Sequence, residues 1–399
     1  MTHAVSRPTA LLLNIAHALD HLFLLVFATA VGAIAADFGV QRWEDLMPYG
    51  VGAFFLFGIG ALPAGRLGDL WGRRSMMLIF FFGIAAAALL AACATGPWQL
   101  AIALTLLGAF AAIYHPVGIP MIVQGAARPG WTIGVNGLAG NLGVAAAAVL
   151  TGVLVQAAGW RTAFVVPAII SIVAGLLFMR YAPRETEPPS KRPTKAAVQL
   201  SPAMLARAFV AMTAAAASGS LLFNFSTNGN GQLLAERMQA VVNDPALLGT
   251  LLALIYVIAS FAQLVVGKLI DRFSLKRLYL VIVLTQIPVL LAAMHAHGWL
   301  LYALLLLEMT LLFGAIPFTD AMIVRYVDDR LRSRVAGMRL TVAFGLSSVA
   351  VWALGPLVKS GGFAFLLGLM AVIAGCTALA VGWLPAERSG EALQSAPAR

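Results

Sequence analysis

The sequence predicts an all-α membrane protein with twelve transmembrane helices in two six-helix pseudo-repeats. Three observations predict it: an apolar composition, a series of long apolar runs, and basic residues gathered in alternate connections. Of 399 residues, 61% are hydrophobic and 11% are charged, and the mean hydropathy is +0.91. A soluble domain of this composition would expose a continuous apolar surface, so we expect the chain to lie in a lipid bilayer.

The apolar runs have the length of membrane-spanning helices. They are about 20–25 residues long and lack the alternation of transmembrane β-strands, which excludes a β-barrel. The first run exceeds the ~7–15 residues of a signal-peptide core, so we expect it to remain as a helix. Dividing the chain at charged residues, Gly and Pro gives these expected helices: 10–35, 46–65, 75–94, 98–123, 133–157, 162–180, 203–229, 246–267, 278–294, 298–322, 335–358 and 362–384.

The basic residues test this helix count. If the N-terminus is cytoplasmic, 22 of the 26 Lys and Arg residues fall on the cytoplasmic side, and the exceptions are Arg42, Arg161, Arg237 and Lys359. Cytoplasmic loops of membrane proteins carry such an excess. We therefore expect a multi-pass protein of the inner (plasma) membrane with both termini in the cytoplasm. The net charge of +10 then reflects orientation in the membrane, not a nucleic-acid partner.

A Pro-rich and charged segment divides the chain. Residues 181–202 lack apolar periodicity and are expected to form a cytoplasmic linker. The linker joins a six-helix bundle at 1–180 to a second at 203–399 that ends in a short tail. Each half carries a related loop, "GRLGDLWGRRS" from Gly65 and "GKLIDRFSLKR" from Gly267. Two parallel six-helix repeats are a transporter architecture.

The first of these loops resembles the signature of the major facilitator superfamily, G-x-L-x-D-x-x-G-R-[RK]. The resemblance implies a secondary transporter in which this loop forms a charge latch with the cytoplasmic end of helix 11. The second loop, with Asp271 and Arg272, would belong to the same cytoplasmic gate. The matching positions of the first loop are Gly65, Leu67, Asp69, Gly72, Arg73 and Arg74.

A narrower resemblance involves helices 1, 4 and 5. "AIYHPVGIP" in helix 4, an Asp in helix 1 and "NGLAGN" in helix 5 are similar to the fosmidomycin-resistance-type branch. That branch exports a small anionic drug against protons. Antiporters of the superfamily often carry a Gly-Pro pair in helix 5, which "GNLGVAAAAVLTG" lacks. The direction of transport therefore stays open.

Polar residues share one face of the first expected helix. Asn14, His17, Asp20 and His21 fall within an arc of about 120°. A charged side chain at the bilayer centre costs at least ~2.5–3.5 kcal/mol, so this face is expected to point into the protein. We predict proton coupling by Asp20 with His17 and His21, and Glu308 in helix 10 is a second candidate. The alternative is a hydrogen-bonded cluster that only fixes helix packing.

Further polar residues are candidates for the substrate cavity. The Asn-rich end of helix 7 and a row of glycines in helix 5 suggest, respectively, an interrupted helix and a tight contact with the other half. Packing is an alternative for each. Together with Asn14, the candidates are Tyr114, His115, Asn136, Asn141, Asn224, Asn228 and Arg339.

The predicted function is secondary active transport of a small, polar or anionic organic solute or drug, coupled to protons, with efflux by antiport favoured. Alternatives are a proton-coupled uptake symporter and an uncoupled facilitator. A membrane receptor or enzyme is less favoured, because the sequence shows no nucleophile motif, Walker loop or paired metal ligands. We expect no cofactor and no metal, and a monomer whose partners are the solute, protons and the lipid bilayer.

Overall fold

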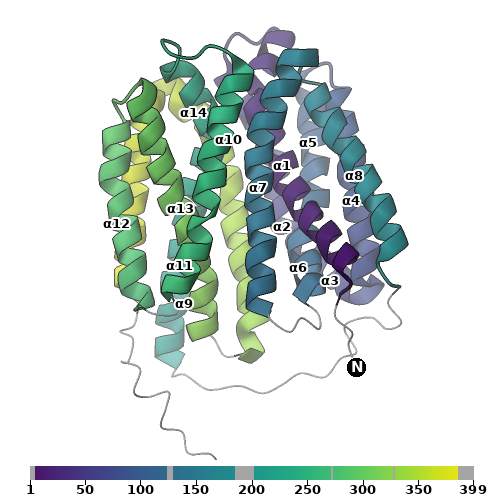
Figure 1. Ribbon diagram of the computed structural model, residues 1–399. Coiled ribbons are helices and arrows are strands. Elements are labelled where there is room, and N and C mark those ends of the chain that lie inside the picture. The colour runs from purple at the N-terminus through teal and green to yellow at the C-terminus, as the bar shows by residue number, and fades with distance from the viewer. Residues whose placement is uncertain (1–4, 124–128, 185–201, 271–272, 327–328, 385–399) are drawn as a thin grey trace, which may run out of the picture.

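The computed structural model describes residues 5–123, 129–184, 202–270, 273–326 and 329–384, and these residues form helices and no strand (Figure 1). The expected all-α class is therefore confirmed. The first half holds α1 (Arg7–Asp37), η1 (Trp43–Asp45), η2 (Met47–Gly50), α2 (Val51–Ile59), α3 (Ala61–Trp71), α4 (Arg73–Ala92), α5 (Pro97–Ala111), η3 (Tyr114–Gly118), α6 (Ile119–Val123), α7 (Pro129–Ala158) and α8 (Thr162–Tyr181). The second holds α9 (Pro202–Arg237), α10 (Pro245–Ser260), α11 (Ala262–Ile270), α12 (Leu275–Ala293), α13 (Gly298–Tyr326) and α14 (Asp329–Gly382).

The spans agree with the expected number once two bends are considered. Among the described residues, 10 helices are long and apolar enough to cross a membrane, and a pair bent by 41° between α2 and α3 makes 11. The apolar part of α14, Arg339–Gly382, contains 44 residues. At 1.5 Å per residue it would be about 66 Å long, twice the hydrocarbon thickness. Gly362, with a φ of 69°, interrupts it and divides it into the two last expected spans.

Local sequence sets the helix ends. Ser6 caps α1 by accepting a hydrogen bond from Thr9 N at 3.4 Å, and Asp244 caps α10 through Ala246 N at 3.0 Å. Gly72 separates α3 from α4 with a φ of 92°, a conformation that favours glycine. These short-range signals explain why the observed helix ends lie within a few residues of most of the expected ones.

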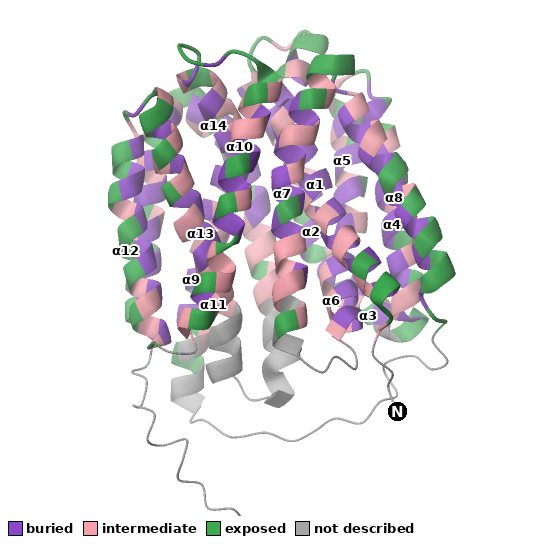
Figure 2. Ribbon diagram, in the orientation of Figure 1, coloured by how far each residue is buried: buried purple, intermediate pink, exposed green. Residues whose placement is uncertain are grey.

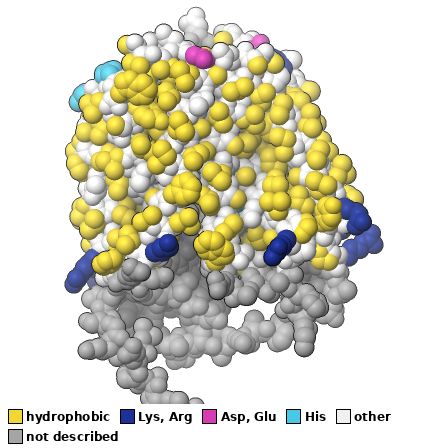
Figure 3. Space-filling view, in the orientation of Figure 1, with side chains coloured by type: hydrophobic (Ala, Val, Ile, Leu, Met, Phe, Trp, Pro, Cys, Tyr) yellow, Lys and Arg dark blue, Asp and Glu magenta, His cyan; other side chains and the backbone are white. Residues whose placement is uncertain are grey.

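The outer surface is suited to lipid. Exposed positions lie on the outward faces of the helices, and hydrophobic side chains cover the middle of the molecule (Figures 2 and 3). Lys and Arg side chains lie along the lower edge in this view, where α1 begins. Five exposed tryptophans lie at helix ends, as expected for anchors at the membrane interface: Trp71, Trp98, Trp131, Trp299 and Trp383.

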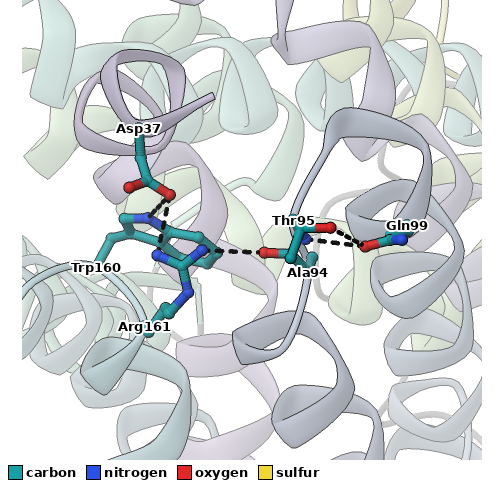
Figure 4. Close-up of polar contacts among 6 residues, drawn as sticks. All are labelled: Asp37, Ala94, Thr95, Gln99, Trp160 and Arg161. Atoms are coloured by element: carbon teal, nitrogen blue, oxygen red, sulfur yellow. Dashed lines mark hydrogen bonds and ion pairs between the residues drawn. The ribbon is translucent and has the colours of Figure 1, made fainter. Parts of the chain in front are cut away.

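An ion-pair network ties together the upper ends of the first half (Figure 4). Arg161 donates to Asp37 Oδ2 at 2.9 Å and to the carbonyl of Ala94 at 3.2 Å. Trp160 donates to the same carboxylate at 3.3 Å, and the Arg161 guanidinium lies 4.4 Å from its ring. The ends of α1, α4 and α7 are thereby joined around one basic side chain.

Glycines bring the two halves of the chain into close contact. A Cβ on Gly58 of α2 would lie 2.6 Å from the Gly345 nitrogen of α14. A Cβ on Gly249 of α10 would lie 2.6 Å from the Ala148 carbonyl oxygen of α7. At the upper end, Lys359 of α14 forms an ion pair with Asp45 of η1. The halves therefore meet both in the middle of the membrane and at its upper surface.

One sequence expectation about helices was wrong, and another was right only in part. The helix containing "NFSTNGNGQ" continues without interruption to Arg237, because Asn224 and Asn228 donate to backbone carbonyls one turn earlier, at 2.9 and 3.0 Å. The glycine row of α7 was expected to face the other half, and this holds only in part: a Cβ on Gly137 would contact Gln263 of α11 at 3.5 Å, but Gly140 and Gly143 pack against His17 and Ala18 of α1 in the same half.

Substituting Gly58 with Ala should destabilise this arrangement. The new methyl would overlap backbone of α14, at a cost of about 1–3 kcal/mol. Gly345→Ala is the matched control, because a Cβ at Gly345 has nothing within 4 Å. We expect the thermal unfolding temperature in detergent to fall for Gly58→Ala and to stay or rise for Gly345→Ala. Equal shifts for the two variants would contradict the close contact between α2 and α14.

Candidate functional site

The candidate site is a buried group of imidazoles and one carboxylate in the first half. The spacing along α1 places His17, Asp20 and His21 on one face of the helix. Asp20 has no exposed surface and His17 is buried, while His21 is partly buried. The polar face of α1 thus points into the protein, because exposing its charged side chain to the hydrocarbon of the bilayer would cost free energy.

The fourth member, His115, comes from a single π-helical turn. Residues Tyr114–Gly118 form this turn between α5 and α6, and Pro116 within it has no N–H to donate. Turns of this type often accompany functional sites in helices. Here the turn brings His115 Nε2 to 3.5 Å from Asp20 Oδ2. Asp20 and His115 therefore do lie at the same depth.

The imidazoles form one compact cluster. His17 Nε2 and His21 Nε2 are 3.2 Å apart, and one ring nitrogen from each of His17, His21 and His115 lies within 4.8 Å of the others. The rings of His17 and His115 meet edge to face with centroids 5.1 Å apart. We refer to His17, His21, His115 and Asp20 as the histidine cluster.

A hydrogen-bond network holds His17 in place. Its Nδ1 lies 2.7 Å from the backbone carbonyl oxygen of Asn136, and its ring stacks on Tyr114 at 4.6 Å. The Asn136 amide donates to the Tyr114 hydroxyl at 2.7 Å and to Asn14 Oδ1 at 2.9 Å. The Tyr114 hydroxyl in turn donates to the Leu13 carbonyl at 3.0 Å. Asn14, Tyr114 and Asn136 are thus a support for the cluster.

The lack of a side chain at Gly140 leaves space for the His17 ring. A Cβ at this position of α7 would lie 2.6 Å from His17 Nε2 and 2.7 Å from its Cε1. The imidazole therefore occupies the space that any larger residue at position 140 would fill.

Glu308 is a second buried acid, in the other half. It lies on α13 with 2% of its surface exposed, and neither carboxylate oxygen has a hydrogen-bond partner in the described part of the chain. Unlike Asp20, it has no imidazole within ion-pair distance among the described residues.

The asparagines of the second half have different surroundings. Asn224 donates to Ser347 Oγ of α14 at 2.8 Å, which joins α9 to α14. Asn228 lines a narrow cavity between α1, α7, α9 and α10, together with Thr29, Thr227 and Tyr256. Neither Asp20 nor Glu308 is among the residues that line it. Asn141 is buried on α7, with no hydrogen-bond partner for its amide nitrogen among the described residues.

Arg339 approaches the cluster from the other half. It lies on α14, donates to Thr319 Oγ1 of α13 at 2.5 Å, and is within electrostatic range of His115. Phe344, one turn further along α14, lies 5.2 Å from the His115 ring and stacks on Phe57 of α2 at 4.4 Å. The sequence did not predict this aromatic contact, because nothing distinguishes Phe57 and Phe344 from the other Phe residues among the 22 in the chain.

Comparison with known proteins supplies the family. The family model described as "Major Facilitator Superfamily" matches residues 13–239, more than half of the chain. The chain belongs to the major facilitator superfamily. It is therefore a membrane transporter rather than an enzyme.

Curated relatives of this transporter cover only part of it. A probable actinorhodin transporter from Streptomyces coelicolor is 30% identical over 176 residues, which are 41% of this chain and 30% of that protein. The puromycin resistance protein pur8 from Streptomyces alboniger is 33% identical over 132 residues, which are 32% of this chain and 26% of that protein. The matched segments thus span less than a third of the relatives' length. The narrower resemblance to the fosmidomycin-resistance-type branch stays a prediction.

Solved structures share the fold of this transporter along almost its whole length. A bacterial homologue of the human lysosomal transporter Spinster, in an inward-facing and occupied conformation, gives a TM-score of 0.72 at 14% identity and covers 95% of this chain and 97% of that chain. A D-xylose–proton symporter gives 0.75 at 13% identity and covers 94% and 96%, respectively. At these identities the likeness concerns the fold alone.

The superfamily signature segment, expected as a loop, is largely helical: it runs through the end of α3 to Trp71, breaks at Gly72 and enters α4 at Arg73. Arg73 donates to the Pro120 carbonyl at 3.3 Å, and Arg74 donates to the Ala182 and Met179 carbonyls at 3.0 and 2.7 Å. A Cβ on Gly65 would lie 3.3 Å from Pro116, so the segment packs beside the π-helical turn. The Asp69 side chain, Asp271 and Arg272 lie outside the described residues. The latch to helix 11 stays a prediction.

Tyr114→Phe should destabilise the transporter, because it removes the hydroxyl's hydrogen bond to the buried Leu13 carbonyl and leaves one Asn136 N–H without a partner. The expected cost is about 1–3 kcal/mol, measured as a lower thermal unfolding temperature. Tyr49→Phe is the control, since no hydrogen bond of the Tyr49 hydroxyl is present within the described residues. If both variants unfold like the wild type, the network does not stabilise the cluster.

Proposed function

We propose that this transporter exports a small polar or anionic organic solute in exchange for protons, and that Glu308 carries the coupling proton. The observation that supports coupling is the burial of Glu308 without a partner for either carboxylate oxygen among the described residues. An isolated ionised carboxylate in an apolar interior is very costly. Glu308 is therefore expected to hold its proton in this conformation.

Alternating access would release that proton. We expect two bundles, 1–180 and 203–399, to tilt about a central site and to expose Glu308 to water on one side. Ionisation then stabilises the water-exposed conformation relative to the sealed one. A proton gradient can bias the equilibrium because the two conformations differ in their affinity for the proton.

The histidine cluster is assigned to solute binding. The sequence favours Asp20 as the proton carrier, with Glu308 as a second candidate, but Asp20 has an imidazole 3.5 Å away that can act as its counter-ion or donor. That imidazole, His115, also belongs to a group of three rings with His17 and His21. These contacts favour recognition of a bound group, while the isolated Glu308 is better suited to carry a proton.

Arg339 and the cluster together favour an anionic solute. Arg339 from α14 and His115 from η3 approach each other across the two halves. A guanidinium and an imidazole can both donate to carboxylate or phosphonate oxygens. The name of one relative, a resistance protein, supports export. Uptake by symport and uncoupled facilitation are the alternatives.

The proposed orientation places the lower edge of Figure 3 in the cytoplasm. Its Lys and Arg side chains support this through the excess of basic residues in cytoplasmic loops. Both termini would then be cytoplasmic, in a bacterial plasma membrane, and the segment around Gly65 and Gly72 would serve as a cytoplasmic gate. We propose that a monomer in the lipid bilayer is sufficient, with neither cofactor nor nucleic acid as partner.

Glu308→Gln should abolish proton movement but retain solute exchange, because the amide mimics the protonated acid and cannot release a proton. Growth-protection assays in an efflux-deficient host, with puromycin, small carboxylates and phosphonates, identify a solute. Proteoliposomes with a pH-sensitive dye then report proton movement when that solute is added. Glu236→Gln, at the exposed end of α9, is the control and should behave as wild type.

The outcome distinguishes the alternatives. Unchanged proton movement in Glu308→Gln would contradict the assignment of the proton. Proton movement in the same direction as the solute would indicate symport. A net flux of solute that stays the same when the proton gradient is collapsed would indicate a facilitator.

Arg339→Gln should raise the KM for an anionic solute by about 10–100-fold, the effect of losing a charge-assisted hydrogen bond of roughly 1.5–3 kcal/mol. Arg339→Lys keeps the charge but not the planar geometry, so its KM should lie between those of the wild type and Arg339→Gln. Measured in the same proteoliposomes, equal KM values for all three proteins would show that the solute does not contact Arg339.

A further inference from the structure

The histidine cluster has the composition of a transition-metal site. Within the described residues, His17, His21 and His115 place three potential ligand nitrogens within 4.8 Å of one another. The Asp20 carboxylate lies 3.5 Å from His115 Nε2 at the edge of the same group. We infer that His17, His21 and His115, with Asp20 beside them, bind a first-row divalent cation such as Zn²⁺.

The spacing of the nitrogens fits such an ion. Zn–N bonds are about 2.0–2.1 Å, so two nitrogens of a tetrahedral site lie about 3.3–3.4 Å apart. His17 Nε2 and His21 Nε2 are 3.2 Å apart. The widest separation, 4.8 Å, exceeds the tetrahedral edge by about 1.4 Å. Rotation of an imidazole about its two side-chain torsions covers that difference.

The hydrogen bond between His17 and Asn136 leaves the His17 ring in a form that can bind a metal ion. A carbonyl only accepts, so the 2.7 Å contact with Asn136 O requires the proton of His17 on Nδ1. In the neutral ring Nε2 then carries a lone pair, and this atom faces the cluster. Metal-bound histidines almost always donate their other N–H in this way, which fixes the tautomer and the ring orientation.

Several atoms of the cluster lack partners. Both carboxylate oxygens of Asp20 and Nε2 of His115 are buried and make no hydrogen bond within the described part of the chain. Buried polar atoms without a partner are rare, and each one needs an explanation. A cation held by the three imidazoles would bind His115 Nε2, and the Asp20 carboxylate beside it would offset the positive charge. Imidazole with carboxylate is a donor set that suits zinc.

The net charge of the metal site indicates which kind of solute it would bind. Three neutral imidazoles, one carboxylate and a divalent ion leave a net charge of +1, and Arg339 adds a further positive charge nearby. Such a site is complemented by an anionic ligand atom. That last step rests on the proposed function, whereas binding of the cation does not.

The other histidines of the chain must first be removed, because His3, His295 and His297 could also bind metal. The background protein is the full chain with His3→Ala, His295→Ala and His297→Ala, purified with a tag that contains no histidine and placed in nanodiscs. Co²⁺ is titrated and followed by its ligand-field absorption. Zn²⁺ then competes, and elemental analysis gives the stoichiometry.

We expect one equivalent of Co²⁺ with a tetrahedral spectrum, displaced by Zn²⁺. His17→Ala, His21→Ala and His115→Ala should each weaken binding at least tenfold. Gly140→Ala, whose methyl would displace the His17 ring, should weaken it by about 10–100-fold, as changes behind a metal ligand do. His→Gln variants replace any Ala variant that does not give a monodisperse protein.

Two results would overturn the inference. One is a background protein that binds no more Co²⁺ than the triple variant His17→Ala/His21→Ala/His115→Ala, which would mean that the cluster is only a hydrogen-bonded network. The other is Co²⁺ binding that is as tight in each of the single variants His17→Ala, His21→Ala and His115→Ala as in the background protein. Neither result bears on transport or proton coupling, which are measured with the organic solute and with Glu308→Gln.

Discussion

A polar group inside a bilayer must find its partner within the protein, and this constraint determines where the charges of this chain can lie. At the membrane surface, the four basic residues on the side opposite the basic edge also have partners within the protein. Each is engaged: Arg42 with Glu44, Arg161 with Asp37, Arg237 with the carbonyls of Ala293 and Met294, and Lys359 with Asp45. The basic residues outside the cytoplasmic side therefore join helix ends. They do not weaken the proposed orientation of the protein in the membrane.

The same constraint separates packing from function among the buried polar residues. Asn224 and Ser347 bond to each other across two helices, and Asn136 uses both amide hydrogens within the first half. Such satisfied groups fix the geometry of their surroundings. Asp20 and Glu308 are the acids among the buried side chains whose oxygens have no hydrogen bond within the described residues, and this makes them the candidates for binding a proton or a ligand.

Periodicity and charge predicted most of the fold, because they act locally or through the bilayer. The polar face of α1 and the matching depth of His115 were predictable for the same reason. The partners of that face were not. His17 forms a hydrogen bond with the backbone carbonyl of Asn136, 119 residues away. Every residue has a backbone carbonyl, so the sequence does not show which one is the partner. The continuity of α9 was missed because its asparagines bond to their own helix, which composition does not reveal.

The two halves are built alike but carry different chemistry. The first gathers three imidazoles and an acid around one point, held by Asn136, Tyr114 and the space at Gly140. In the described part of the second half, Glu308 is the buried acid, and its carboxylate oxygens have no hydrogen-bond partner there. A cluster of imidazoles can bind a ligand through small rotations of its side chains, whereas an isolated acid responds mainly to the arrival of water. Since the halves meet through glycines and stacked rings such as Phe57 and Phe344, they can separate without breaking hydrogen bonds there, and a change at either site can be passed to the other.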